Sequence, residues 1–273
     1  MKILLFVIIL CLLPALAGCF MLRVRRGQDA MAPLRKFRYA HRGLYDPDAG
    51  VPENSLPAFS RAITHGFGAE LDVHLLRDGS LAVFHDSALA RMTGRGGYLE
   101  DLSAPELSAC FLGGTQESIP EFRDVLSLFD GTGLPLIVEL KSFRGNCAAL
   151  CARTMAELDR FHVPYCVESF DPRCVRWLRK HRPEVIRGQL SSDFTRDRTG
   201  NGPVMDFLAA KLLLNFYSRP DFIAYHFEDR RRAPLRLCQK RGAQLVYWTI
   251  RSRQDLDTAE REGAIPIFEH FLP

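Results

Sequence analysis

Runs of apolar and β-branched residues alternate with helical patterns along most of this 273-residue chain. This alternation is typical of βα units, in which consecutive strands lie parallel and are joined by helices. Eight strands in a chain of this length predict an α/β fold, a single TIM (β/α)8 barrel, which typically needs about 250 residues. The eight strand candidates are 38–42, 69–75, 134–141, 164–170, 185–190, 221–227, 245–250 and 265–269. The helical stretches between them include 56–65, 121–129, 147–161, 172–181 and 255–261, and Asn54 or Ser55 can cap the first.

A ninth apolar run, 81–85, follows the second strand after only a few residues. A parallel crossover needs a dozen residues or more, so this run must return as a β-hairpin. Asp78-Gly79 is a strong signal for a two-residue hairpin loop. With that loop, the ladder places His85 opposite Asp72. The turn therefore predicts that a histidine and a carboxylate lie close together.

The N-terminus carries a hydrophobic segment, from Ile3 to Leu22, without a single charge. As a helix these 20 residues extend about 30 Å, enough to cross the core of a bilayer. We expect residues 1–24 to form a transmembrane anchor or signal segment, 25–37 a basic juxtamembrane linker and 38–273 the catalytic barrel. In a second interpretation, cleavage before a lipidated Cys19 makes the chain an exported lipoprotein.

Positive charge is concentrated beside this segment. Seven basic residues lie within the first 38 positions, against one acidic residue, which leaves 29 of the 36 basic and 31 of the 32 acidic residues elsewhere. This distribution favours a membrane surface as partner and argues against nucleic acid. The arginines that follow the segment favour a barrel on the cytoplasmic side of a membrane. The basic residues are Lys2, Arg23, Arg25, Arg26, Arg35, Lys36 and Arg38.

The barrel contains six cysteines without a CxxC pattern or a compact framework. Buried thiols in a reducing compartment are the simplest interpretation, which agrees with a cytoplasmic location. These cysteines are Cys110, Cys147, Cys151, Cys166, Cys174 and Cys238.

Three acidic residues belong to predicted barrel strands. Glu70 and Asp72 are two apart on one strand and point to the same face, and Glu139 lies near the end of another apolar strand. Active sites of TIM barrels lie at the C-terminal ends of the strands. Neighbouring carboxylates repel, and a hard divalent cation with oxygen ligands removes that conflict. The pattern predicts a site for Mg²⁺ or Ca²⁺.

Two histidines and two cationic residues are expected at the same mouth. His41 ends the first strand and His85 ends the hairpin, so they suit general acid and base roles near neutral pH. Arg42 and Lys141 offset the negative charge of the carboxylates and can hold a phosphate. Trp248 ends an apolar strand and is a candidate for the floor of the substrate pocket. Together these groups indicate a phosphoester site.

The chain resembles the glycerophosphodiester phosphodiesterases, in their membrane-anchored bacterial form. Several motifs in the order and spacing of that family carry the resemblance. They are His41-Arg42-Gly43, Pro52-Glu53-Asn54-Ser55, Glu70-Leu71-Asp72-Val73, Val83-Phe84-His85-Asp86, Arg91-Met92-Thr93-Gly94, Val138-Glu139-Leu140-Lys141, Ser169-Phe170-Asp171 and Tyr247-Trp248-Thr249.

The resemblance implies metal-dependent hydrolysis of glycerophosphodiesters to sn-glycerol 3-phosphate and an alcohol, within phospholipid and glycerol metabolism. It also implies two chemical steps, in which the substrate's own glycerol hydroxyl attacks phosphorus and water then opens the cyclic phosphate. By position it implies metal ligands, an acid–base pair and a phosphate clamp, with Glu53 as a further candidate near the metal. The ligands are Glu70, Asp72 and Glu139, the acid–base pair is His41 and His85, and the clamp is Arg42 and Lys141.

Some features depart from the family and leave alternatives open. Arg251 stands where many members carry Asn, and the chain ends without the usual Thr-Asp-x-Pro. A lysophospholipase D-type or cyclising activity on lysolipids is therefore an alternative, and a catalytically silent module that binds glycerophosphodiesters is another. We expect the long stretch 91–119 to cap the mouth and to influence head-group choice. The sequence does not indicate an oligomeric state.

Overall fold

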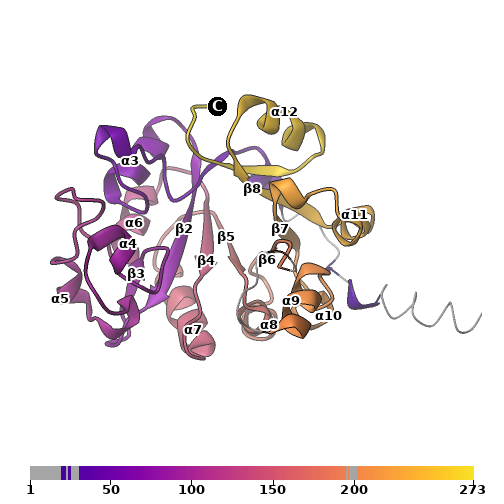
Figure 1. Cartoon of the computed structure of the whole chain (residues 1–273), viewed down its shortest axis with the longest axis horizontal. Helices are drawn as coiled ribbons and strands as arrows, with labels where there is room; N and C mark the ends of the chain where they lie inside the picture. Colours follow the sequence, from indigo (N-terminus) through magenta and orange to yellow (C-terminus); the bar gives the residue numbers. More distant parts are fainter. Residues whose placement is uncertain (1–19, 23, 26–30, 195, 197–201) are drawn as a thin grey trace, which may run out of the picture.

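The computed structural model describes residues 20–22, 24–25, 31–194, 196 and 202–273. Eight parallel strands close into a barrel, because β1 pairs with β2 on one side and with β9 on the other. Helices connect the strands and lie outside the barrel (Figure 1), which confirms the predicted TIM fold. In order around the barrel the strands are β1 (Tyr39–Ala40), β2 (Gly68–Leu75), β4 (Leu136–Leu140), β5 (Tyr165–Ser169), β6 (Arg187–Ser191), β7 (Phe222–His226), β8 (Gln244–Ile250) and β9 (Ile265–Phe268).

The hairpin after β2 is present, but its register differs by one residue from the prediction. β3 (Leu81–Val83) pairs antiparallel with β2, and the amide of Phe84 donates to the carbonyl of Asp72 at 3.0 Å. Phe84, not His85, is therefore opposite Asp72. The loop has three residues, because the amide of Leu76 already donates to Ser80 O at 2.9 Å. Gly79 has a φ of 85°, the left-handed conformation that such three-residue loops require.

The five predicted helices are all present, within a few residues of their expected ends. Ser55 caps the first of them through its hydroxyl, which accepts from the amide of Ala58 at 3.3 Å. Among the described residues, three helices after β6 were not predicted. The main helices are α3 (Leu56–Thr64), α6 (Phe122–Phe129), α7 (Cys147–Leu158), α8 (Pro172–His181), α9 (Pro203–Ala210), α10 (Asn215–Ser218), α11 (Ala233–Lys240) and α12 (Arg253–Arg261).

The segment before β1 closes the N-terminal end of the barrel. Met31 and Leu34, at the short helix α2 (Ala32–Arg35), are buried among apolar residues from the beginnings of the strands. Tyr39 donates its hydroxyl to Leu34 O at 2.9 Å, and Arg25 forms an ion pair with Asp221. The described part of the segment 25–37, expected to be a linker, is therefore packed against the barrel.

The predicted anchor falls mainly on residues 1–19, which lie outside the described residues. Among the residues that are described, no helix combines the length and the apolar character that a membrane crossing requires.

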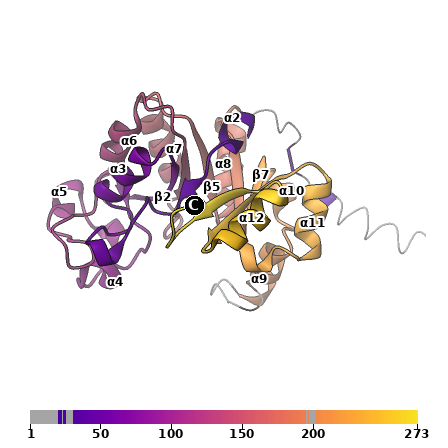
Figure 2. The same ribbon diagram turned by 90° about the horizontal axis from the view of Figure 1, so that it is seen from above.

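The stretch 91–119 forms a small lobe beside the barrel (Figure 2), next to β3 (Figure 1). It contains α4 (Ala90–Thr93), a 3-10 turn (Leu99–Asp101) and α5 (Ala104–Leu107). Apolar residues of the lobe and the hairpin form a core of their own. Among the described residues that line the two cavities at the barrel mouth, none belongs to this lobe. The expected cap over the mouth is therefore wrong, because the lobe's apolar face packs on the hairpin. This second core consists of Leu76, Ala82, Phe84, Leu89, Leu99, Leu107, Cys110, Leu112 and Ile119.

Candidate active site

The three predicted acidic residues meet at the C-terminal ends of neighbouring strands. Asp72 on β2 is in register with Glu139 on β4, and Glu70 lies two residues before Asp72 on the same strand. One carboxylate oxygen from each residue lies within 4.8 Å of the others, and all three residues are buried. This spacing and the all-oxygen donor set fit a hard divalent cation.

The electrostatics of this cluster favour a bound cation. Burial raises the pKa of Glu70 well above its usual range, and the charges of Asp72 and Glu139 raise it further. Burial also raises the pKa of Glu139, to about 7, although Lys141 opposes the shift. Burial acts to raise the pKa of Asp72 too, but Lys141, His85 and Arg42 together hold it well below its usual range. Three deprotonated carboxylates are thus disfavoured here unless a cation joins them.

Lys141 and Asn54 hold the side chain of Asp72 from two sides. The Lys141 ammonium lies 3.0 Å from Asp72 Oδ1 and 2.7 Å from Glu139 Oε1. Asn54 donates its side-chain amide to Asp72 Oδ2 at 2.8 Å. Sequence reasoning treated Asn54 only as a possible helix cap and missed this contact. The sequence did contain a signal for Asn54, because this residue follows Glu53 directly in the family motif Pro52-Glu53-Asn54-Ser55.

Arg42 is fixed by its main chain and by its guanidinium. Its amide donates to Glu70 Oε2 at 3.1 Å, and its Nη1 donates to Glu53 Oε1 at 2.8 Å. The following residue, Gly43, has a φ of 79°, and a Cβ there would lie 2.8 Å from Ala58 Cβ. Only glycine therefore lets this turn pack against α3, which explains the His-Arg-Gly motif.

Glu53 belongs to a chain of ion pairs along the rim of the mouth. Besides Arg42, it accepts from Arg91 at 2.6 Å. Arg91 in turn donates to Asp86 Oδ2 at 2.5 Å, and Asp86 Oδ1 lies 2.6 Å from His85 Nδ1. Burial raises the pKa of Glu53, but the two arginines outweigh it and lower the pKa overall. The predicted secondary candidate thus connects the guanidinium of Arg42 to the orientation of His85.

His41 is oriented by Glu269, a residue that sequence reasoning did not select. His41 Nδ1 lies 2.5 Å from Glu269 Oε2, and His41 Nε2 lies 3.9 Å from Glu70 Oε2. Tyr45 donates its hydroxyl to the same Glu269 oxygen at 2.9 Å, and Arg251 donates to the other oxygen at 2.8 Å. Burial lowers the pKa of His41, and Glu269 partly opposes this. The sequence signal was an acidic residue at the end of the last predicted strand, 265–269.

His85 is held through both its ring and its main chain. Burial lowers its pKa to about 4, with Lys141 and Arg42 acting in the same direction and Asp72 against them. His74 Nε2 lies 3.3 Å from the carbonyl oxygen of His85, and His74 Nδ1 lies 2.7 Å from Glu100 Oε1. The lobe thereby positions His85 through Glu100, although it does not cover the mouth.

Two adjoining cavities, of about 880 Å³ and 390 Å³, open at this mouth. Both are lined by His85, Glu139 and Lys141, and the smaller also contains His41 and Trp248. The Trp248 ring makes edge contacts with Phe170, at 5.7 Å between centroids, and with His226, at 5.1 Å. The larger cavity continues along an apolar wall made by Phe194, Met205, Ala209, Leu212 and Leu214.

A cation site, two oriented histidines and two cationic side chains suit a phosphoester substrate. Residues 41–272 match the Glycerophosphoryl diester phosphodiesterase family. The chain belongs to that family. As a glycerophosphodiester phosphodiesterase it is a phosphoric diester hydrolase, which confirms the reaction class that the sequence motifs implied.

Relatives of this glycerophosphodiester phosphodiesterase support the assignment. The glycerophosphodiester phosphodiesterase of Caldanaerobacter subterraneus subsp. tengcongensis is 27% identical over 233 residues, which cover 82% of this chain and 89% of that protein. The solved structure of an Oleispira antarctica phosphodiesterase in complex with the product sn-glycerol-3-phosphate has a TM-score of 0.68 at 22% identity, covering 85% of this chain and 92% of the other. A lysophospholipase D of Rattus norvegicus is 33% identical over 102 residues, a third of this chain and 32% of the relative.

Proposed function

We propose that this enzyme hydrolyses glycerophosphodiesters to sn-glycerol 3-phosphate and an alcohol, with a divalent cation, Mg²⁺ or Ca²⁺, held by Glu70, Asp72 and Glu139. The observation that carries the proposal is the meeting of these three buried carboxylates, within 4.8 Å, at a mouth that also holds His41 and His85. When bound, the cation supplies positive charge that stabilises the anionic phosphate in the transition state.

The two histidines supply acid–base catalysis in this proposal. Glu269 holds His41 and Asp86 holds His85, in each case at Nδ1, so that Nε2 is the nitrogen available to the substrate. One imidazole accepts the proton of the glycerol hydroxyl as its oxygen attacks phosphorus. The other gives a proton to the departing alcohol, which leaves a cyclic phosphate. Water then opens the ring with the roles exchanged, giving sn-glycerol 3-phosphate.

Arg42 and Lys141 bind the phosphate in this scheme. Both are mostly buried cations at the smaller cavity. Burial acts to lower their pKa values, but the carboxylates around them outweigh it and raise both, so the two side chains stay charged throughout the pH range of the reaction. Before substrate binds, the same carboxylates offset the positive charges of Arg42 and Lys141. Trp248 and Phe170 form an apolar wall against which the glycerol carbons can pack.

An assay of the full chain in detergent tests the proposal. We expect release of sn-glycerol 3-phosphate from glycerophosphocholine with Mg²⁺ or Ca²⁺, and none with EDTA. His85→Ala and Glu139→Ala should each abolish it, whereas Glu157→Ala on the outside of α7 should not. A folded chain that releases nothing from any soluble diester would contradict the proposal. Release from lysolipids would then support the second candidate below, and binding without turnover would support the silent module.

A lysophospholipase D-type activity is the second candidate, and one observation favours it. The apolar wall of the larger cavity leads from Lys141 to Met205 on α9, where Val204 and Phe207 are exposed. An acyl chain could lie along this wall. Turnover of lysophosphatidylcholine that exceeds turnover of glycerophosphocholine, and that Met205→Asp lowers selectively, would establish this activity. The same assay detects a cyclic phosphate product if the second step is slow.

We also propose that residues 1–24 attach the enzyme to a membrane with the barrel on the cytoplasmic side, where it serves phospholipid and glycerol metabolism. The uncharged segment and the arginines after it support this proposal. Lipidation at Cys19, with export, is the alternative. Incorporation of labelled fatty acid that Cys19→Ala abolishes would favour export, and protection of the barrel from protease added outside intact cells would favour the cytoplasmic location.

A further inference from the structure

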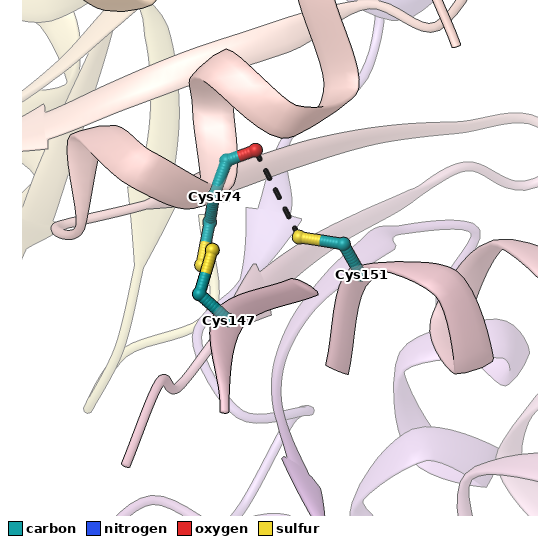
Figure 3. Close-up of side chains that lie close together, drawn as sticks. All are labelled: Cys147, Cys151 and Cys174. Carbon is teal, nitrogen blue, oxygen red and sulfur yellow. Dashed lines mark hydrogen bonds between the residues drawn. The ribbon is translucent and has the colours of Figure 1, made fainter. Parts of the chain in front are cut away.

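Three buried cysteines converge beside the barrel, away from the carboxylate cluster. Cys147 and Cys151 are one turn apart on the same face of α7, and Cys174 is near the beginning of α8 (Figure 3). Their three sulfur atoms lie within 4.8 Å of one another. The Cys151 thiol also points at the carbonyl oxygen of Cys174, at 3.8 Å. The spacing in the sequence did not predict this cluster, because α7 and α8 meet only in the folded barrel.

The arrangement matches the ligand geometry of a soft metal ion. A Zn–S bond is about 2.3 Å long, so thiolates in a tetrahedral site lie about 3.8 Å apart. The three sulfurs need to move by no more than about 1 Å to reach that spacing. Thiolates select zinc and similar soft ions, whereas carboxylates select Mg²⁺ and Ca²⁺. We propose that Cys147, Cys151 and Cys174 form a three-thiolate site for Zn²⁺, separate from the catalytic cation.

The local charge supports thiolates at this position. Cys147 is the first residue of α7 and Cys174 the third residue of α8, so the positive ends of two helix dipoles meet here. A divalent ion is what would allow all three to lose their protons.

Of the three cysteines, Cys147 lies nearest to solvent. Cys147 keeps 8% of its surface exposed, while Cys151 and Cys174 are fully buried. Gly145, two residues before Cys147, and Arg173, directly before Cys174, line the larger cavity. The cluster therefore lies close to the wall of that cavity.

A metal at this position would join the loops that follow β4 and β5. These loops are already connected by a hydrogen bond from Ser142 Oγ to Asp171 Oδ2 at 2.6 Å. The same loops carry Lys141 and Phe170 into both cavities. Zn²⁺ would thus stabilise the wall of the active site without contacting the substrate.

Cobalt is a suitable probe because Co²⁺ bound by thiolates absorbs through sulfur-to-metal charge transfer. We expect the reduced full chain to bind one Co²⁺ with this absorption, and Zn²⁺ to displace it while Mg²⁺ does not. Cys147→Ser, Cys151→Ser and Cys174→Ser should each abolish the absorption. Cys166→Ser and Cys238→Ser, which change other buried cysteines, should leave it unchanged.

A second measurement needs no substitution and so does not depend on folding of the variants. Zn²⁺ should protect Cys147, Cys151 and Cys174 from alkylation in the native chain, with mass spectrometry locating the protected thiols. Reduced folded protein without the charge-transfer absorption, or without this protection, would overturn the proposal. So would a disulfide between two of the three cysteines in chain purified without an oxidant. These readouts do not use phosphodiesterase activity, so their outcome is independent of the proposed function.

Discussion

His41 and Glu269 lie 228 residues apart in the chain, yet His41 Nδ1 is 2.5 Å from Glu269 Oε2. Closure of the barrel explains the contact, because β1 pairs with β9 and the amide of His41 donates to Phe268 O at 2.9 Å. The carboxylate accepts the Nδ1 proton, which directs Nε2 of the neutral imidazole toward the mouth. The first and last strands of the barrel thus bring together the two members of one proposed catalytic unit.

Replacement of Glu269 by Gln tests that unit. Gln keeps the shape and one acceptor oxygen but removes the charge, so we expect kcat to fall at least about tenfold. Because Glu269 raises the pKa of His41, its loss should lower that pKa. If His41 is the base, the acidic limb of kcat/KM then moves to lower pH. The pH profile of the variant measures this shift, with Glu262→Gln, which accepts from Tyr247, as the matched control. An unchanged kcat with an unchanged profile would mean that Glu269 is dispensable.

The carboxylate cluster predicts a pH-dependent response of stability to metal. In the metal-free fold, burial raises the pKa of Glu139 from its ordinary 4.5 to about 7. The fold therefore favours the protonated form of Glu139. The stability that Glu139 contributes in this way is fully present below pH 4.5 and is lost as pH rises through about 7. Glu70, whose pKa is also raised, acts in the same direction. The lowered pKa of Asp72 contributes stability that stays constant across this window and is lost only at lower pH.

A divalent cation binds the deprotonated carboxylates, so its stabilising effect should grow with pH. We expect saturating Ca²⁺ or Mg²⁺ to raise the melting temperature clearly at about pH 8 and little at about pH 5. Differential scanning calorimetry of the wild-type chain measures this. Glu139→Gln should remove most of the pH dependence of this metal-induced rise, and Glu157→Gln should retain it. A metal-induced shift of equal size at both pH values would argue against the carboxylates as ligands.

Phe84 connects the stability of the lobe to the position of His85. It is fully buried in the second core and precedes His85 directly. Phe84→Ala removes a buried aromatic ring and should lower the free energy of unfolding by about 3–5 kcal/mol. Phe84→Leu fills most of the space and should retain more of that stability and more activity. Urea unfolding of both variants measures the difference, and an equal, small loss in both would mean that the lobe repacks freely.

The barrel and much of its site could be predicted because their signals are local. Each strand is a short apolar run, and Glu70, Asp72 and Glu139 stand out as acidic residues within those runs. The hairpin register could not be predicted, since a three-residue loop with Gly79 in the left-handed conformation competes with the two-residue loop that Asp-Gly usually forms. Glu269 depends on barrel closure, and the cysteine cluster depends on the packing of α7 against α8. Neither leaves a periodic signal in the sequence.

Asn54 combines a strained backbone with a contact to a candidate metal ligand, and two substitutions separate the two roles. Its φ is 54°, and its side-chain amide donates to Asp72 Oδ2 at 2.8 Å. Glycine adopts this backbone conformation easily, but Asn54→Gly removes the hydrogen bond to Asp72. We therefore expect metal affinity to fall about 10–100-fold with little loss of stability. Asn54→Ala loses the hydrogen bond as well and adds a backbone cost of about 1–2 kcal/mol. Titration of activity with Mg²⁺ and urea unfolding measure the two effects. If the glycine variant needed no more metal than wild type, Asn54 would act only through the backbone. Asp72 would then be positioned by Lys141 and Arg42 without it.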